Sequence, residues 1–287
     1  MFFISGAIIV TFSVIGGFVA IGGHLAVLWQ PFEFVIICGA ALGAFIIANP
    51  KTVLFGMGKA FGQILRGPYH TKETYLELLS LLYAIFRLAK SKGMLVLEQH
   101  VENPEESELF RKFPIFFADK HALGFVCDYL RMMVLGAENP YEMEPLMDEE
   151  IEVHHTEHMT LSDAIRTVGD GLPALGIVAA VLGVIHTMGS ITEPPEVLGK
   201  LIGGALVGTF VGVLLSYGFV APMADALKAV YDSETKYYQC IKVGLLAHMQ
   251  GYAPSVSIEF ARKALFSNVR PTFYEVEEAV DALPSFG

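Results

Sequence analysis

The runs GDGLPALGIVAAVLGVIHTMGS (169–190) and LIGGALVGTFVGVLLSYGFVAPM (201–223), joined by a short loop, decide the fold of this chain. Apart from Asp170, neither run contains a charged side chain. A helix needs roughly 20 apolar residues to cross a bilayer, so each run is long enough for one crossing. The pair therefore predicts a membrane hairpin, with Pro173 near its start and Pro222 near its end.

Small residues recur at helical spacing on both helices of this hairpin. Small side chains let helix backbones approach closely, and this drives association where lipid tails offer equal apolar contact. Generic helix packing is enough to explain them. The prolines are harder to explain in that way, because each lacks an N–H and frees a carbonyl one turn earlier, and in lipid such a carbonyl needs a partner or water. The freed carbonyls belong to Gly169 and Gly218, and the small residues are Gly176, Ala180, Gly183, Gly204, Gly208 and Gly212.

The composition is that of an integral membrane protein. Of 287 residues, 53% are hydrophobic and only 17% are charged, against about 25% charged in ordinary soluble domains. The net charge is −11 and no basic tract stands out, which argues against nucleic acid as a partner. Three separated cysteines suggest neither disulfides nor a metal motif. No nucleophile motif or glycine-rich phosphate loop occurs, so we predict no enzyme activity and no cofactor.

The N-terminal region predicts two more membrane helices. Residues 1–30 carry no charged side chain, and the first helix is expected at about residues 2–21. A cleaved signal peptide is the alternative, but the basic start is missing and the apolar stretch is too long. Residues 34–48 predict a second, shorter helix that Asn49-Pro50 ends. The chain is therefore expected to be all-α with four membrane spans.

Lysine and arginine predict the orientation. The loops near residues 22–33 and 190–200 contain only Lys200, whereas the other 18 of the 19 basic residues lie in 51–168 and 223–287. Basic residues stay on the cytoplasmic side, so both termini and the long middle segment are expected there. The expected organisation is two membrane helices in 1–50, a large helical cytoplasmic domain in 51–168, two membrane helices in 169–223 and cytoplasmic C-terminal helices in 224–287.

The middle segment indicates helices and few strands. Apolar residues at helical spacing predict a helix over 71–92. Asn103-Pro104, followed by two glutamates, predicts that a helix begins at Pro104, because proline favours the first helical position. Asn139-Pro140 repeats this signal. His154 and His158 lie one turn apart, as metal ligands would, but no third ligand follows at a recognisable spacing, so a solvated acidic helix face is favoured over a metal site.

The interiors of the predicted spans contain no Asp, Glu, Lys or Arg. Carboxylates within membranes normally mark proton and ion relays. Either the chain does not conduct ions, or a partner helix supplies the acid. His186 lies near the outer end and is expected to have an interfacial structural role. Thr209 and Ser216 share a helix face, with Tyr217 beside them; they form either a polar stripe facing a central helix or hydroxyls that bond their own backbone carbonyls.

Four stretches show a resemblance to the MotA family of flagellar motor stator subunits. Two lie in the hairpin: DGLPALGIVAAVLGVIHTM (170–188) and ALVGTFVGVLLSYGFVAPMA (205–224) resemble the family's third and fourth membrane helices. The other two, LEQHVENPEESELF (97–110) and GYAPSVSIEFARKALFSNVRPTFYEVEE (251–278), are similar to its cytoplasmic parts. The resemblance covers essentially the whole chain.

The resemblance implies a function and partners. Members of this family form a homo-oligomeric ring around a MotB dimer in the bacterial inner membrane, and MotB brings the proton-accepting aspartate. Ion flow along the MotA–MotB interface then drives torque on the rotor switch protein FliG. The related TolQ and ExbB energisers, which drive an envelope protein, usually have three spans. Four spans and the long loop after the second favour the stator, and a TolQ/ExbB-type energiser is the alternative.

The resemblance also implies roles for particular residues. Pro173 and Pro222 match the prolines that couple ion passage to movement, while Ala180, Thr209 and Tyr217 match positions that line the ion path. Thr209 is one hydroxyl among aliphatic side chains, with few other oxygens nearby to hold sodium, so protons are the favoured coupling ion.

A second set of matching residues lies in the cytoplasmic part, where the family contacts the rotor. Glu98 matches the acidic residue of this contact. Its basic partner falls on Lys90 in an alignment without gaps, but the local sequence RLAKSKGM leaves Arg87 and Lys92 as alternatives.

Overall fold

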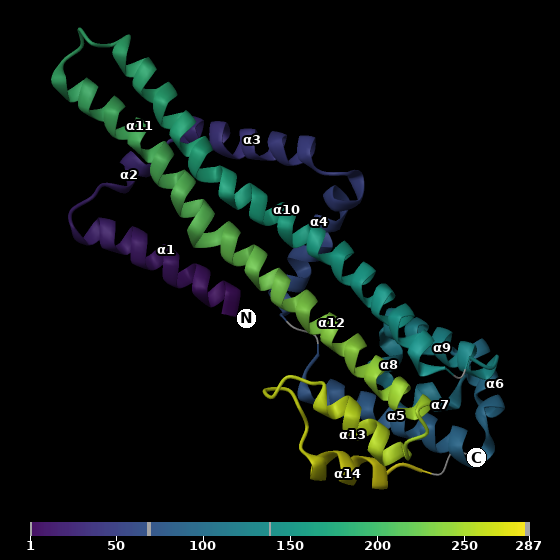
Figure 1. The fold of residues 1–287 in the computed structure, drawn as a ribbon. Helices are drawn as coiled ribbons and strands as arrows, with labels where there is room; N and C mark the ends of the chain where they lie inside the picture. Colours follow the sequence, from purple (N-terminus) through teal and green to yellow (C-terminus); the bar gives the residue numbers. More distant parts are fainter. Residues whose placement is uncertain (1, 68–69, 138, 285–287) are drawn as a thin grey trace. The chain divides into compact units, whose positions relative to one another are not determined.

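The computed structural model describes residues 2–67, 70–137 and 139–284, and these residues form helices and loops without a strand (Figure 1). They fold into two compact units. The first unit comprises Met1–Gly67 and Glu157–Tyr231, and the second comprises Pro68–Thr156 and Asp232–Gly287. This division follows packing, not membrane position, so the predicted membrane and cytoplasmic segments stay a prediction.

The first unit contains the apolar helices. Four helical stretches of the described chain are long and apolar enough to cross a membrane, which confirms the predicted all-α fold with four spans. They are Phe3–Ala20, Leu25–Ala48 and parts of Pro140–Met188 and Pro195–Met249. The elements are α1 (Phe2–Ala20), α2 (Leu25–Leu28), α3 (Pro31–Ala48), α4 (Lys51–Arg66), part of α10 (Pro140–Met188), α11 (Pro195–Leu215), the π-helical segment η2 (Ser216–Val220) and the start of α12 (Ala221–Met249).

The second span begins earlier than the sequence pattern predicts. Helix α3 begins at Pro31, not at Phe34, and Glu33 therefore lies in its first turn. Proline suits the first helical position, and an acidic side chain is stabilised near the positive end of the helix dipole. The prediction that the spans carry no carboxylate in their interiors still holds, but Glu33 belongs to a helix and not to a loop.

Two apolar clusters hold the first unit together. One joins α3, α10 and α11 through Ile37, Leu172 and Val211, and the other joins α4, α10 and α12 through Ile64 and residues of both longer helices. Large apolar side chains elsewhere on these helices point outward, as is expected for helices whose solvent is lipid. Examples are Phe12, Ile47, Phe55 and Ile185, which are 74%, 89%, 85% and 62% exposed.

The second unit is built around α5 (Lys72–Lys92), which confirms the helix predicted over 71–92. Thr71 caps its start, with its hydroxyl accepting from the backbone N–H of Thr74, and Gly93 ends it with a φ of 87° that only glycine adopts easily. Around α5 lie η1 (Met94–Leu97), α6 (Glu98–Glu102), α7 (Glu108–Arg111), α8 (Pro114–Ala118), α9 (Lys120–Val134), the first part of α10, the rest of α12, α13 (Pro254–Lys263) and α14 (Phe273–Asp281).

The structure places one helix start differently from the prediction. Residues 103–106 form a turn, and α7 begins at Glu108 with Ser107 as its cap. The Ser107 hydroxyl accepts from the N–H of Phe110 and lies 2.9 Å from Nδ1 of His100. Serine is a strong N-cap, so it prevails over the proline three residues earlier. At the second such signal the prediction is correct, because α10 begins at Pro140.

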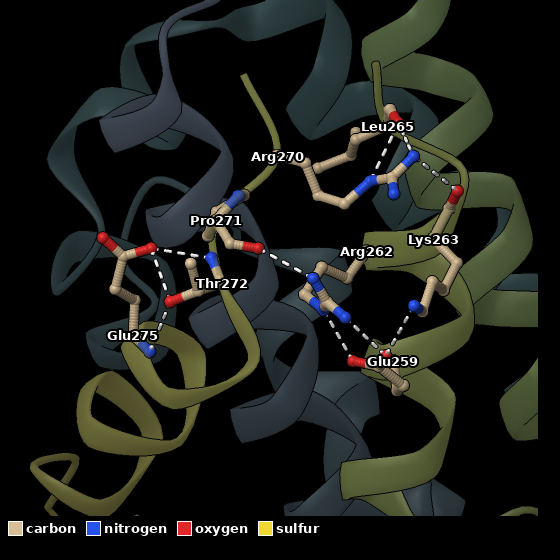
Figure 2. Close-up of polar contacts among 8 residues, drawn as sticks. All are labelled: Glu259, Arg262, Lys263, Leu265, Arg270, Pro271, Thr272 and Glu275. Carbon is tan, nitrogen blue, oxygen red and sulfur yellow. Dashed lines mark hydrogen bonds and ion pairs between the residues drawn. The ribbon is translucent and has the colours of Figure 1, made fainter. Parts of the chain in front are cut away.

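The C-terminal helices are fastened by a polar cluster around Arg262, which is only 7% exposed (Figure 2). Its guanidinium donates to both carboxylate oxygens of Glu259 and, through Nη1, to the carbonyl of Pro271. Thr272 and Glu275 then cap α14 reciprocally, and Lys72 forms an ion pair with Glu275 at 2.6 Å. These contacts attach α14 to the start of α5.

Candidate functional site

Helices α10 and α11, which lie side by side in Figure 1, touch through backbone atoms. A methyl group added at Gly176 would lie 2.8 Å from the carbonyl oxygen of Gly208. One added at Gly212 would lie 2.6 Å from the carbonyl oxygen of Leu172 and 2.9 Å from Cα of Gly176. No larger residue fits at these distances unless the helices separate. We call Gly176, Gly208 and Gly212 the glycine seam; the close approach that the small-residue spacing predicts is confirmed here.

The helix that carries Pro222 is widened just before this proline. Residues Ser216–Val220 are π-helical, and the N–H of Ala221 donates to the carbonyl of Ser216, five residues earlier. Pro222 cannot donate a hydrogen bond, and its ring would clash with the carbonyl four residues earlier in a regular α-helix. The π-helical turn gives the chain an extra residue at this point, and such turns occur frequently at functional sites.

The two proline regions meet. A methyl group added at Gly169 would lie 3.3 Å from Cγ1 of Val220 and 3.4 Å from the backbone nitrogen of Ala221. Gly169 is the residue whose carbonyl Pro173 leaves without its helical partner. The disturbance that Pro173 introduces into α10 therefore lies against the segment that directly precedes Pro222.

Two hydroxyls beside this region lack the backbone bonds that two threonine hydroxyls elsewhere in the spans make. The Thr11 and Thr187 hydroxyls donate to the carbonyls of Ala7 and Gly183, four residues earlier. Within the described residues, the hydroxyls of Thr209 and Ser216 make no hydrogen bond, and Ser216 is fully buried. Of the two interpretations left open by the sequence, back-bonding to carbonyls therefore does not apply to this pair.

The predicted ion-path residues are brought together in part. The backbone nitrogen of Ala180 would lie 3.1 Å from a methyl group at Gly208, and Cα of Thr209 would lie 3.3 Å from one at Gly176, so both residues adjoin the glycine seam. Tyr217 lies within the π-helical segment and is 66% exposed. Pro173 is half-buried and Pro222 is exposed.

The structure adds a carboxylate that the sequence reasoning did not single out. Glu33, in the first turn of α3, lines a cavity of about 620 Å³ together with His186 and Lys200. Within the described part of the chain, none of these three side chains forms an ion pair. His186, in the last turn of α10, is exposed. The signal for Glu33 was Pro31, which marks the first helical position and so places the glutamate in the first turn.

The second unit carries the predicted rotor-contact residues. Arg87, Lys90 and Lys92 lie on α5, and Glu98 begins α6 after the turn at Gly93. All four charged side chains are exposed, and none has an ion-pair partner among the residues that the structure describes. Other charges of this unit are paired, as in Lys120–Glu105, Arg131–Glu102 and Lys242–Asp148.

Histidine 248 lies close to one of these charges. Its ring stacks on Phe86 with centroids 4.5 Å apart. Burial, assisted by the positive charge of Lys90, lowers the pKa of His248 below its usual value. The imidazole is therefore neutral at physiological pH, and Lys90 is the positive charge at this place.

His154 and His158, the pair considered above as possible metal ligands, pack on tyrosines. His154 lies 4.9 Å from the Tyr238 ring and His158 lies 4.7 Å from the Tyr231 ring, between centroids. Among the described residues, no group of three metal-ligating side chains occurs.

The whole chain matches known proteins. The family model "Motility protein A N-terminal" matches residues 4–93, and the model "MotA/TolQ/ExbB proton channel family" matches residues 120–240. Motility protein A of Salmonella typhimurium is 46% identical over 283 residues, covering 99% of this chain and 96% of that protein. The chain belongs to the Motility protein A family. Its counterpart in Escherichia coli is 45% identical with the same coverage.

Solved structures show the same fold. The MotAB structure from C. jejuni superposes with a TM-score of 0.76 over 93% of this chain and 96% of that chain, at 21% identity. Membership in the Motility protein A family identifies a multi-pass membrane protein of a proton-channel family. The resemblance stated from the hairpin and the cytoplasmic motifs is thereby confirmed, and so is the stator reading over the TolQ/ExbB-type energiser. This family belongs to the flagellar motor and is not one of enzymes.

Proposed function

We propose that this chain is the stator subunit that, with MotB, conducts protons and turns their flow into torque on the rotor switch protein FliG. Several copies form a ring around a MotB dimer in the bacterial inner membrane, with both termini in the cytoplasm. The observation that carries the proposal is the π-helical segment Ser216–Val220, placed directly before Pro222 and against Gly169. Family membership supports the same function.

The missing acid defines what the partner supplies. The hairpin has no carboxylate between Asp170 and Glu193 or between Lys200 and Asp225. A proton relay through this region therefore needs an acceptor from another helix, and a MotB carboxylate fills that role. The unbonded hydroxyl of Thr209, with Ala180 and Tyr217, forms the surface that this acceptor faces.

The helix irregularities at Pro173 and Pro222 allow protonation of the partner carboxylate to be followed by a movement of the helices. Protonation removes the charge of the partner carboxylate and changes how its helix packs against the ring. Hinges are positions that absorb a change of dihedral angles. The π-helical segment and Pro222 have this character, and they lie against Gly169, whose carbonyl loses its helical partner to Pro173. Helices α10 and α12 run on from these prolines without a break, and the second unit contains their other ends.

The unpaired charges of the second unit supply the rotor contact. Lys90 and Glu98 are exposed and available to complementary charges, which steer and register partners more than they add affinity. Arg87 and Lys92 are the alternative bases. Coupling by protons is favoured because the hydroxyl of Thr209 is one oxygen in an aliphatic setting, whereas a sodium ion requires several.

The proposal is tested in a deletion strain. The wild-type chain should restore swimming to paralysed but fully flagellated cells, and it should pass protons only when expressed together with MotB. Pro173→Ala and Pro222→Ala should insert and assemble with MotB as the wild type does, yet give little or no torque. Pro195→Ala, at the first helical position of α11 where proline disturbs no hydrogen bond, is the control and should swim normally.

Two results would contradict the proposal. One is robust proton flux from the chain without MotB. The other is a pair of proline variants that assemble fully and swim like the wild type, which would make the π-helical segment incidental.

A further inference from the structure

Helix α4 has a basic outer face in an otherwise acidic protein. The net charge of the chain is −11, yet no acidic residue occurs between Glu33 and Glu73, and α4 contains Lys51, Lys59 and Arg66. Lys51 and Lys59 are exposed, and neither has a carboxylate partner among the described residues. Charges that are left unpaired in this way are available to an anionic partner.

The chain connection fixes the level at which α4 lies. The spanning helix α3 ends at Ala48, and only Asn49 and Pro50 separate it from Lys51. Three Cα–Cα steps lead from Ala48 to Lys51 and span at most about 11 Å, so α4 must begin at the membrane surface where α3 ends. At about 1.5 Å per residue, its 16 residues make a helix of roughly 24 Å.

The inner face of α4 is held firmly by protein. Ala60 and Ile64 are buried in the cluster with α10 and α12, and a methyl group at Gly56 would lie 2.9 Å from the Leu161 side chain. The Tyr231 hydroxyl donates to Oε1 of Gln63 at 3.2 Å. The helix therefore cannot turn its lysines inward to find partners.

Large apolar side chains share the outer face with the lysines. Phe55 is 85% exposed and Phe61 is 51% exposed. In a 3.6-residue helix Lys51, Phe55 and Lys59 follow each other at four-residue spacing along one face. Two lysines with a phenylalanine between them fit the pattern of helices that lie in the headgroup region, with the apolar ring in the acyl boundary.

We propose that the outer face of α4 is a binding surface for anionic phospholipids, with Lys51 and Lys59 on the headgroup phosphates and Phe55 in the acyl boundary. Charge complementarity selects this occupant, because an anionic leaflet attracts each lysine while its acyl boundary accepts the exposed ring of Phe55. The inference requires only that α3 crosses a bilayer, and it is independent of torque and of the coupling ion.

The test reads lipid contact at one position. Trp29 is the only tryptophan, so Phe55→Trp in a Trp29→Phe background places a single fluorophore on the outer face of α4. The complex with MotB is reconstituted into phosphatidylcholine vesicles with and without phosphatidylglycerol, and quenching by the brominated form of each lipid is compared. Brominated phosphatidylglycerol should quench the tryptophan more strongly than brominated phosphatidylcholine. The affinity for phosphatidylglycerol relative to phosphatidylcholine should rise about fivefold for each lysine near the surface. High salt should reduce this preference.

Variants and competitors separate the outcomes. Lys51→Gln with Lys59→Gln should abolish the preference for phosphatidylglycerol, whereas Lys263→Gln, an exposed lysine on α13, should leave it unchanged. Equal quenching by both lipids in the Phe55→Trp probe chain with both lysines present would overturn the proposal. Absence of quenching by either lipid would also overturn it, because the face would then be covered by protein. Loss of the preference on addition of inorganic phosphate, beyond the effect of matched ionic strength, would assign the site to a free phosphate instead.

Discussion

Replacement of Gly212 by alanine tests the glycine seam most directly. The added methyl group would lie 2.6 Å from the carbonyl oxygen of Leu172, whereas ordinary contact begins at 3.4 Å, so α10 and α11 must move apart by roughly 0.8 Å. The atoms that this methyl group would meet belong to the backbone of Leu172 and Gly176, so they cannot rotate away as a side chain could. Overpacking of this kind costs about 1–3 kcal/mol. A separation of this size would also remove roughly a quarter to a half of the dispersion energy of each neighbouring contact.

Gly199 on the same helix is the matched control. A methyl group there meets nothing within 4 Å. Alanine is favoured over glycine in a helix by about 1 kcal/mol, and both variants gain this term. The difference between the free energies of unfolding of the two variants therefore measures the close packing at the glycine seam. Gly212→Ala should be less stable than Gly199→Ala by about 1–3 kcal/mol.

Thermal unfolding of the complex with MotB measures this difference. A change of 1 kcal/mol shifts the midpoint by about 2–4 °C in a domain of 150–250 residues, so Gly212→Ala should melt several degrees below Gly199→Ala. Equal midpoints for the two variants would refute the argument, since they would show that α10 and α11 do not touch through backbone atoms at this place.

Three further predictions concern the charges and the ion. Glu98→Lys should reduce swimming without lowering the protein level, because an exposed ion pair contributes only about 0–1 kcal/mol to folding. A compensating charge reversal on the rotor should restore part of the speed. Loss of the protein from the membrane would instead show that Glu98 has a structural role. Swimming speed should fall with a protonophore and stay constant when sodium is replaced by potassium, so loss of motility in sodium-free medium would reject proton coupling. The Lys72 ammonium and the Thr272 cap lower the pKa of Glu275 from 4.5 to about 2, so this carboxylate stabilises α14 above pH 4.5 and loses its effect as pH falls toward 2. The protection of the α14 amides, measured as hydrogen exchange relative to the intrinsic rate at each pH, should fall over that range, and Glu275→Gln should remove this change.

Much of the fold follows from local physical rules. Charge-free runs of sufficient length gave four membrane helices, and the spacing of small residues gave the contact between α10 and α11. Both rules depend on neighbours along the chain, so a sequence is enough to apply them. The start of α7 shows where such rules conflict. Pro104 and Ser107 both signal a helix start, and only the hydroxyl of Ser107 finds a backbone N–H to cap, that of Phe110.

The candidate site was predicted less completely, because its details depend on contacts between helices. Pro222 shows from sequence that a carbonyl loses its partner, but a kink, a bound water or a π-helical turn could each respond to that loss. The response seen here lies against Gly169 of α10, where an added methyl group would lie 3.4 Å from the backbone nitrogen of Ala221. Similarly, the position of Glu33 beside His186 and Lys200 follows from how three helices meet, although Pro31 could have placed it within the helix.

The hydroxyl of Ser216, at the start of the π-helical segment, is a buried polar group without a hydrogen-bond partner among the described residues. A buried polar group without a partner costs about 1–3 kcal/mol, and the carbonyl of Gly212, four residues earlier, is an acceptor of the kind that the Thr187 hydroxyl uses at Gly183. The backbone N–H of Ser216 is shared between the carbonyls of Gly212 and Val213, an arrangement common at the end of an α-helix. A rearrangement of this segment that gave the hydroxyl a partner would recover part of this cost. Under the proposed function, the repacking of the partner helix on protonation is the event that would drive such a rearrangement.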